Sequence, residues 1–126
     1  MVVEFTKAGL EAEIARVVSR FHEDQHGCRP KTTVAYAVGD MVVARCTGCF
    51  TVTEEQLAST EDGRKLVKSA RRELRSLNRR EIEGEVGSIV GLRVLRSFWD
   101  FDIRVGEQVE VYVLDRDISE KLRTAP

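Results

Sequence analysis

The sequence predicts an α+β fold in which two β-hairpins form one antiparallel sheet with helices packed on one face, in the order α-ββ-α(α)-ββ. Three patterns support this prediction. Apolar residues recur at helical spacing between Leu10 and Phe21, a glycine-led turn at Gly39-Asp40 divides two short strands, and valines alternate with polar residues between Val109 and Val113. A length of 126 residues fits a single domain over residues 1–126, with flexible ends expected at 1–7 and 117–126.

The composition is that of a water-soluble globular protein. Hydrophobic residues make up 42% of the chain and charged residues 33%, and the formal net charge of −1 gives no global attraction to nucleic acid. No apolar run approaches the length of a membrane span, and the N-terminus lacks the apolar core of a signal peptide. We therefore expect a cytoplasmic protein without membrane insertion, in which the three cysteines are free thiols.

The first helix is expected from about Ala8 to Gln25. Gly27 suits its end, because glycine accepts the left-handed conformation that closes helices. The apolar residues of the segment fall on one face: Leu10, Ile14, Val17, Val18 and Phe21.

The first hairpin is expected over Thr32–Val38 and Met41–Phe50, with Gly39-Asp40 as a type II′ turn. This turn places Val38 opposite Met41. The other face of the hairpin then carries small side chains that allow a helix to pack closely: Ala35, Ala37, Val42, Ala44 and Cys46.

A helical region is expected from Thr53 to about Val90. Thr53 and Gln56 fit a capping box, Gly63 separates a short helix from a second one starting near Thr60, and Asn78 marks a further break. The expected buried stripe comprises Leu66, Val67, Ala70, Leu74 and Leu77, continued by Ile82, Val86, Ile89 and Val90.

The second hairpin is expected over Leu92–Arg104 and Gln108–Leu114, and the polar tail from Asp115 to Pro126 has room for one helical turn. In the last strand, Val109, Val111 and Val113 alternate with Glu110 and Tyr112, which is a half-buried pattern. In the strand before it, one face is expected to carry Leu95, Trp99, Phe101 and Ile103, and the other Arg96, Phe98, Asp100 and Asp102. Phe98, on the solvent-facing side of this strand, is a candidate subunit contact.

Cys46-Thr47-Gly48-Cys49 is a CxxC motif, which occurs in redox pairs and in zinc sites. A redox pair usually begins a helix, whereas this motif ends a strand. A zinc site would need ligands such as Cys28, His22 or His26, brought over the end of the hairpin. Cys28, Cys46 and Cys49 are therefore weak metal candidates, and the alternative is that the motif supplies packing residues. His22 and His26, four residues apart, also fit the C-terminal end of a helix dipole.

A basic stripe follows the long helical region between residues 64 and 80. The candidate binding residues are Arg64, Lys68, Arg71, Arg72 and Arg75. An anion or nucleic acid would use Arg71, Arg72, Arg75, Arg79 and Arg80, while the alternative is a solvated helix face with internal ion pairs.

Paired carboxylates at Asp100 and Asp102 could bind a cation, or simply form the wet side of a strand. The chain has no phosphate loop, nucleophile elbow or metalloprotease signature. We therefore expect a protein that is not an enzyme and that needs no cofactor.

Several segments together resemble the MpsC-type family of small bacterial domains: Gly27–Pro30, Asp40–Arg45, Gly48–Leu57, Glu61–Val67 and Arg71-Arg72. The family is named after a sodium-translocating, membrane-potential-generating system whose membrane partners resemble transporters of dissolved inorganic carbon. The resemblance implies an MpsC-like domain over 8–116, acting as an accessory or regulatory module, with no catalytic residue to carry over. Cys46 stands where the family usually has an aliphatic residue, which favours packing over zinc binding, and Arg29-Pro30 stands where it often has Gly-Pro.

The expected partners are a second copy of the chain and an integral membrane transporter, at the inner face of the membrane, rather than nucleic acid. A homodimer is expected because the long helical region and the aromatic-rich third strand offer more apolar surface than a four-stranded sheet buries. Anion or nucleic-acid binding through the basic stripe 64–80 is the alternative function.

Overall fold

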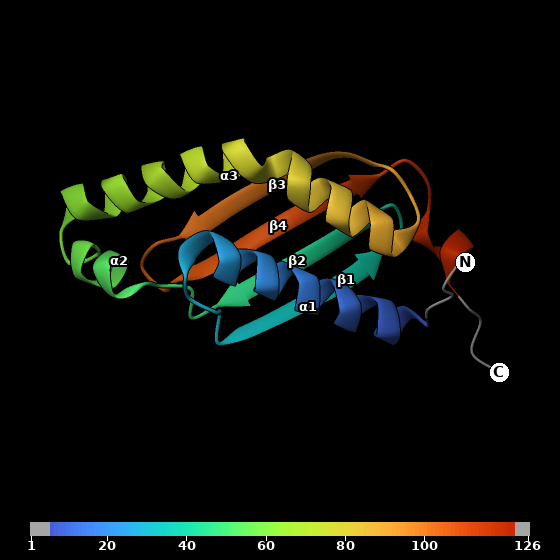
Figure 1. Cartoon of the computed structure of the whole chain (residues 1–126), viewed down its shortest axis with the longest axis horizontal. Coiled ribbons are helices and arrows are strands. Elements are labelled where there is room, and N and C mark those ends of the chain that lie inside the picture. Colours follow the sequence, from blue (N-terminus) through green and yellow to red (C-terminus); the bar gives the residue numbers. More distant parts are fainter. Residues whose placement is uncertain (1–5, 123–126) are drawn as a thin grey trace.

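The computed structural model describes residues 6–122 and has the predicted α+β architecture. One four-stranded antiparallel sheet lies behind two long helices (Figure 1). The elements in chain order are α1 (Lys7–His26), β1 (Thr32–Val38), β2 (Met41–Thr47), α2 (Val52–Leu57), α3 (Glu61–Val90), β3 (Val94–Asp102), β4 (Glu107–Leu114) and the 3-10 helix η1 (Ile118–Lys121). The predicted order of helices and hairpins is confirmed, and no helix among residues 6–122 is long and apolar enough to cross a membrane.

The two hairpins join through their second strands, so the sheet order is β1-β2-β4-β3. The predicted register of the first hairpin is confirmed, with Val38 opposite Met41. Gly39 has a φ of 59° while Asp40 keeps a negative φ, as the predicted type II′ turn requires. β2 ends at Thr47 rather than at Phe50, because the chain turns at Gly48, whose φ is 67°.

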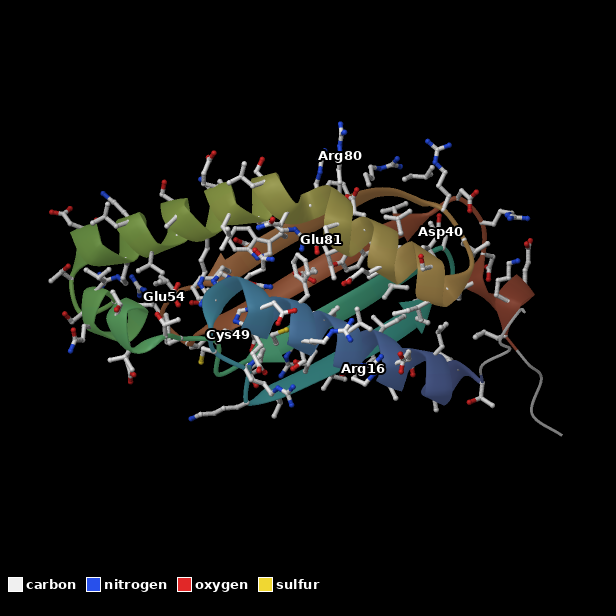
Figure 2. The ribbon with its side chains drawn as sticks, viewed as in Figure 1. Arg16, Asp40, Cys49, Glu54, Arg80 and Glu81 are labelled. Carbon is white, nitrogen blue, oxygen red and sulfur yellow. The ribbon has the colours of Figure 1, made fainter. Side chains whose placement is uncertain are left out.

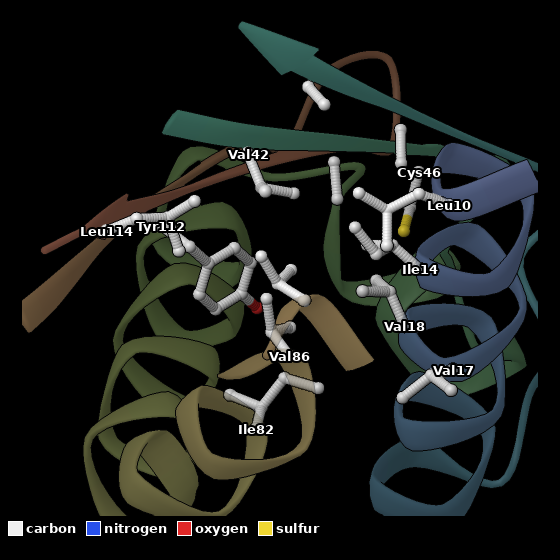
Figure 3. Close-up of a cluster of buried hydrophobic side chains, with 14 of the residues drawn as sticks. Leu10, Ile14, Val17, Val18, Val42, Cys46, Ile82, Val86, Tyr112 and Leu114 are labelled. Carbon is white, nitrogen blue, oxygen red and sulfur yellow. The ribbon is translucent and has the colours of Figure 1, made fainter. Parts of the chain in front are cut away.

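Both long helices cover the same face of the sheet, as predicted, with α1 over the first hairpin and α3 over the second (Figure 1). Leu10, Ile14 and Val18 of α1 meet the sheet next to Ile82 and Val86 of α3, and all five are buried (Figure 3). The small side chains Ala35, Ala37 and Ala44 are also buried, which lets α1 lie close to the strands. Gly27 closes α1 in the left-handed conformation, as expected.

The predicted capping box is wrong by two residues. α2 is capped by Thr51, whose Oγ1 accepts from the Glu54 main-chain nitrogen at 3.2 Å, while Glu54 Oε1 accepts from the Thr51 nitrogen at 3.0 Å. Thr53 lies inside the first turn. Two Thr-x-x-Glu/Gln patterns overlap here, Thr51 with Glu54 and Thr53 with Gln56. The first of them begins the helix, and its Glu54 carboxylate also pairs with Arg71 of α3.

α3 starts after Thr60, as predicted, but it has no break at Asn78. The Asn78 side chain donates to Gln25 Oε1 of α1 and to the Leu74 carbonyl oxygen, so a residue that often ends helices serves a helix–helix contact here. The expected buried stripe is also partly wrong, because Leu66 and Leu77 are 63% and 73% exposed.

β4 is half-buried, as predicted, but its buried side is the polar one. Gln108, Glu110, Tyr112 and Leu114 face the helices, while the valines between them are only partly covered. In β3 a register shift between Val94 and Arg96 leaves Leu95 46% exposed, contrary to prediction, whereas Phe101 is buried as expected. The helical turn expected in the tail is η1. Of the ends predicted to be flexible, 1–7 and 117–126, residues 1–5 and 123–126 lie outside the described residues, while Lys7 belongs to α1 and Ile118 is buried.

Candidate functional site: a buried ion-pair cluster and an open sheet face

The sequence suggested that the basic stripe of α3 faces solvent along its whole length. The structure shows that part of the stripe is buried. Arg71 is 2% exposed and the Arg75 side chain 10%, because both point toward the sheet. Arg64 and Lys68 are half-buried, whereas Arg72, Arg79 and Arg80 are exposed, and Arg80 points away from the molecule (Figure 2). The candidate binding residues Arg64, Lys68, Arg71, Arg72 and Arg75 thus do not share one accessible surface.

Arg71 joins α3 to α2 and to the end of β2. Its Nε and Nη2 donate to the two carboxylate oxygens of Glu54 at 2.5 and 2.6 Å, a two-pronged pairing that fixes both side chains. Nη2 also donates to the Cys49 carbonyl oxygen, and the guanidinium lies 4.3 Å from the centre of the Phe101 ring. Burial opposes ionisation of Glu54, but the Arg71 pairing leaves the pKa of Glu54 lowered.

Arg75, one turn further along α3, forms a second buried ion pair with β4. Its Nη1 lies 2.7 Å from Glu110 Oε1, which also accepts from Gln108 Nε2 at 3.0 Å. Tyr112 donates its hydroxyl to Glu110 Oε2 at 2.5 Å. Burial, helped by the Glu110 charge, raises the pKa of Tyr112 well above its ordinary value. The polar side of β4 is therefore buried because Arg75 neutralises its carboxylate.

His22 and His26 of α1 close this cluster from the other side. Their rings lie 4.4 Å apart between centres. Burial, the His26 ring and the Arg71 charge lower the pKa of His22 to about 3, and burial with the Arg71 charge lowers the pKa of His26 to about 4. Both histidines are therefore neutral at pH 7, and the expected role as charged partners of the helix dipole is not what the structure shows.

A small cavity of about 20 Å³ is lined by polar side chains, among them both histidines, Arg71 and Glu110, and by apolar ones such as Val18 and Trp99. Within residues 6–122, two buried side-chain atoms have no hydrogen-bond partner, His22 Nε2 and Arg71 Nη1, and both residues line this cavity. The volume suits one water molecule. The cluster thus has the size of a hydration site rather than of a substrate pocket.

The cysteines of the CxxC motif are buried and free. Cys49 and Glu54 lie together at the α2 end of the sheet (Figure 2). The hydrogen bond between the two thiols raises the pKa of Cys46 and lowers that of Cys49. Cys28 is half-buried and its thiol donates to the Phe50 carbonyl oxygen at 3.4 Å. No group of three or more His, Cys, Asp or Glu side chains in the described part of the chain is arranged to hold a metal ion.

The paired carboxylates of β3 do not converge on a cation site. Asp100 Oδ1 lies 3.1 Å from Lys68 Nζ and also accepts from the Phe101 main-chain nitrogen, while Asp102 accepts from the Arg104 nitrogen in the turn. Each carboxylate therefore serves a local contact.

The face of the sheet opposite the helices forms a second candidate site, called the open face here. Its apolar residues are Val34, Tyr36, Val38, Met41, Val43, Phe98, Val109, Val111 and Val113, and its charged residues are Arg45, Arg96 and Asp100. The side chains of Tyr36, Val38 and Phe98 are 46%, 54% and 58% exposed. An apolar surface of this extent is typical of an interaction site.

The sequence pointed to Phe98 but missed most of these functional candidates. No motif marks Glu54 or Glu110 as a site residue. The strongest signal in the sequence is the alternation of β4, where Gln108, Glu110 and Tyr112 share a side with Leu114. The spacing of His22 and His26 places them on one helix face, but it does not indicate that both line a cavity with Arg71.

The fold and these two sites define a small α+β domain with a charged cluster inside it and an apolar sheet face outside. The chain belongs to the MpsC family: the family model described as "Na+-translocating membrane potential-generating system (MpsC)" matches residues 6–116. The chain is also 26% identical over 110 residues to "Uncharacterized protein YrhF" of Bacillus subtilis (strain 168). The aligned region covers 86% of this chain and 90% of that protein. No solved structure matches the chain.

Proposed function

We propose that the protein is a cytoplasmic accessory or regulatory module, not an enzyme, for a membrane system that translocates sodium or takes up dissolved inorganic carbon. The observation that carries the proposal is the family match over residues 6–116, together with the family's description as a membrane-potential-generating system. The module sits at the inner face of the membrane through contact with an integral membrane transporter, and it acts as a homodimer.

The chemistry of the buried cluster supports this proposal. Arg71, Arg75 and their carboxylate partners are tied to one another, and the cavity beside them has the volume of about one water molecule. The cluster links α1, α2, α3 and the sheet, through His22 and His26 of α1, Glu54 of α2, Arg71 and Arg75 of α3, and Glu110 of β4. Its role is to hold these elements in place, and the outer surfaces are left for partners.

An affinity pull-down tests the function directly. The tagged protein is expressed in its own host and recovered from gently solubilised membranes, with the tag alone as the first control. Recovery of an integral membrane transporter is the expected result. Recovery of nucleic acid, or of the protein with no membrane partner, counts against the accessory role.

A matched variant locates the contact. Leu66 and Leu77 are exposed on the outer side of α3, so Leu66→Glu/Leu77→Glu changes a surface without touching the core. Loss of the transporter with this variant places the contact on α3, and retention places it on another surface.

Anion or nucleic-acid binding through the stripe 64–80 stays the alternative. Arg71 and Arg75 are engaged in buried ion pairs, which leaves Arg72, Arg79 and Arg80 as the exposed cations of that set. Binding of this kind weakens steeply with added salt, and Arg72→Glu/Arg80→Glu would abolish it. A transporter contact that persists at high salt distinguishes the two functions.

A further inference from the structure

Nine of the twelve residues on the open face are apolar or aromatic. On β4 the side facing the helices carries Gln108, Glu110, Tyr112 and Leu114, whereas the side facing away carries Val109, Val111 and Val113. The three valines of β4 thus lie on the side that nothing in residues 6–122 covers, and Leu114 is the one aliphatic residue of the strand that faces the helices. In a sheet with one face exposed to water, the valines would be expected on the buried side and the polar residues on the exposed side. The reversed arrangement in β4 is explained if a partner covers the outer side.

The strand register arranges the open face in three rows that run across all four strands. The middle row is Tyr36, Val43, Val111 and Phe98; one flanking row is Val38, Met41, Val113 and Arg96; the other is Val34, Arg45, Val109 and Asp100. The middle row is entirely apolar. The flanking rows carry opposite charges at the same edge, Arg96 in one row and Asp100 in the other.

We propose that a second copy of the chain covers the open face, with the two sheets packed face to face about a two-fold axis that runs across the strands along the middle row. Each flanking row then meets the other flanking row of the partner. Val34 lies opposite Val38 of the partner subunit, Val109 opposite Val113 of the partner subunit, and Asp100 opposite Arg96 of the partner subunit. The contact is isologous, so every pair occurs twice.

The charges favour this orientation over the other simple one. An axis along the strands would place Asp100 against Val34 of the partner subunit and Arg96 against Val38 of the partner subunit, which desolvates both charges without pairing them. The axis across the strands pairs them instead. The long Arg96 side chain also tolerates the angle of about 30° at which aligned sheets pack.

Asp100 and Arg96 are both available for an ion pair between subunits. Asp100 is 81% exposed and uses only Oδ1 for its contacts with Lys68 and the Phe101 nitrogen, which leaves Oδ2 for a partner. Arg96 is exposed and forms no ion pair within residues 6–122. Arg45 lies 3.6 Å from Glu107 at the polar end of the sheet, so its aliphatic stem remains available to pack.

The area of the open face is close to that of the smallest specific interfaces. Four strands about 4.8 Å apart, each seven residues long with a rise of about 3.3 Å per residue, make a sheet plane of about 450 Å². Two copies bury about 900 Å² of sheet plane, which is close to the roughly 1,000 Å² of the smallest specific interfaces. This inference rests on the homodimer named in the proposed function but not on the transporter, so the two can fail separately.

Light scattering on the purified full chain after size exclusion tests the proposal. The expected mass is twice the 14.2 kDa of one chain. Val111→Glu, in the middle row, should give a folded monomer by circular dichroism. Leu77→Glu, equally non-conservative but on the outer side of α3, should leave the dimer intact. A monomeric wild type at about 100 µM, or a dimer that Leu77→Glu and not Val111→Glu dissociates, overturns the proposal.

Charge reversal tests the orientation without changing the core. Asp100→Arg alone places two like-charged pairs in the dimer, as does Arg96→Asp alone, and each should raise the dimer dissociation constant about tenfold or more. Mixing the two variants creates a heterodimer in which both pairs are again opposite in charge, and the double variant restores both pairs as well. Recovery of wild-type affinity in both cases is the expected result, and failure of both to recover refutes this axis.

Discussion

Acid should destabilise this protein well above the pH at which its carboxylates titrate, because His22 and His26 fold in the neutral form. Their pKa values are about 3 and about 4 in the folded protein, against about 6.5 in an unfolded chain. As the pH falls through 6.5, the unfolded chain binds protons that the folded protein does not. The free energy of unfolding therefore decreases from pH 6.5 downward, until the folded histidines also titrate.

The size of the effect follows from these values. Between pH 7 and pH 5, each histidine costs about 2 kcal/mol of stability, or about 4 kcal/mol for the pair. This is a large share of the roughly 5–15 kcal/mol that stabilises a typical domain. The lowered pKa of Glu54 acts below pH 4.5 and so lies outside this window.

Urea unfolding followed by the fluorescence of Trp99, the single tryptophan, measures the effect at pH 7, 6 and 5. His22→Phe and His26→Phe keep a ring but cannot bind a proton, and each should retain about half of the pH dependence. A wild-type midpoint that does not move between pH 7 and pH 5 would refute the reasoning. So would a His22→Phe variant with the full wild-type dependence.

Three further predictions are measured by urea unfolding at pH 7. Arg71→Met leaves the partly buried Glu54 carboxylate of α2 without its partner and should cost about 1–3 kcal/mol, whereas a cost below about 0.5 kcal/mol would show that the ion pair is dispensable. Gly63→Ala should destabilise, since its Cβ would lie 1.8 Å from a main-chain oxygen of α2, while Gly84→Ala, with no atom within 4 Å of that Cβ, should stabilise by about 0.5–1 kcal/mol. Thr51→Ala should lower the free energy of unfolding by about 1 kcal/mol, and Thr53→Ala should change it little, because Thr51 caps α2. A larger loss with Thr53→Ala than with Thr51→Ala would show that Thr53 is the cap.

The hairpins and the first helix were predictable because their signals are local. The Gly39-Asp40 turn fixes which residues of β1 and β2 are opposite each other, and Gly27 ends α1 by its own backbone freedom. The start of α3 near Thr60 was equally clear. Such features depend on a few neighbouring residues, so the sequence contains them.

The faces of α3 and β4 were not predictable in the same way. Apolar spacing on α3 indicated that Leu66 and Leu77 are buried and that Arg71 and Arg75 are exposed, and the structure shows the opposite for all four. Arg71 finds its carboxylate on α2, 17 residues earlier, and Arg75 finds Glu110, 35 residues later. A pattern within one helix cannot show that a counter-charge arrives from another element.

The sequence by itself determined the α+β class, the order of the elements, the register of the first hairpin and the membership of the MpsC family. Only the tertiary structure decided which sides of α3 and β4 are buried, where the histidines lie, and which sheet face remains open. Burying a charge is favourable only beside its partner, and that meeting is a property of the assembled fold. The same long-range pairing that places Glu110 inside turns the valines of β4 outward.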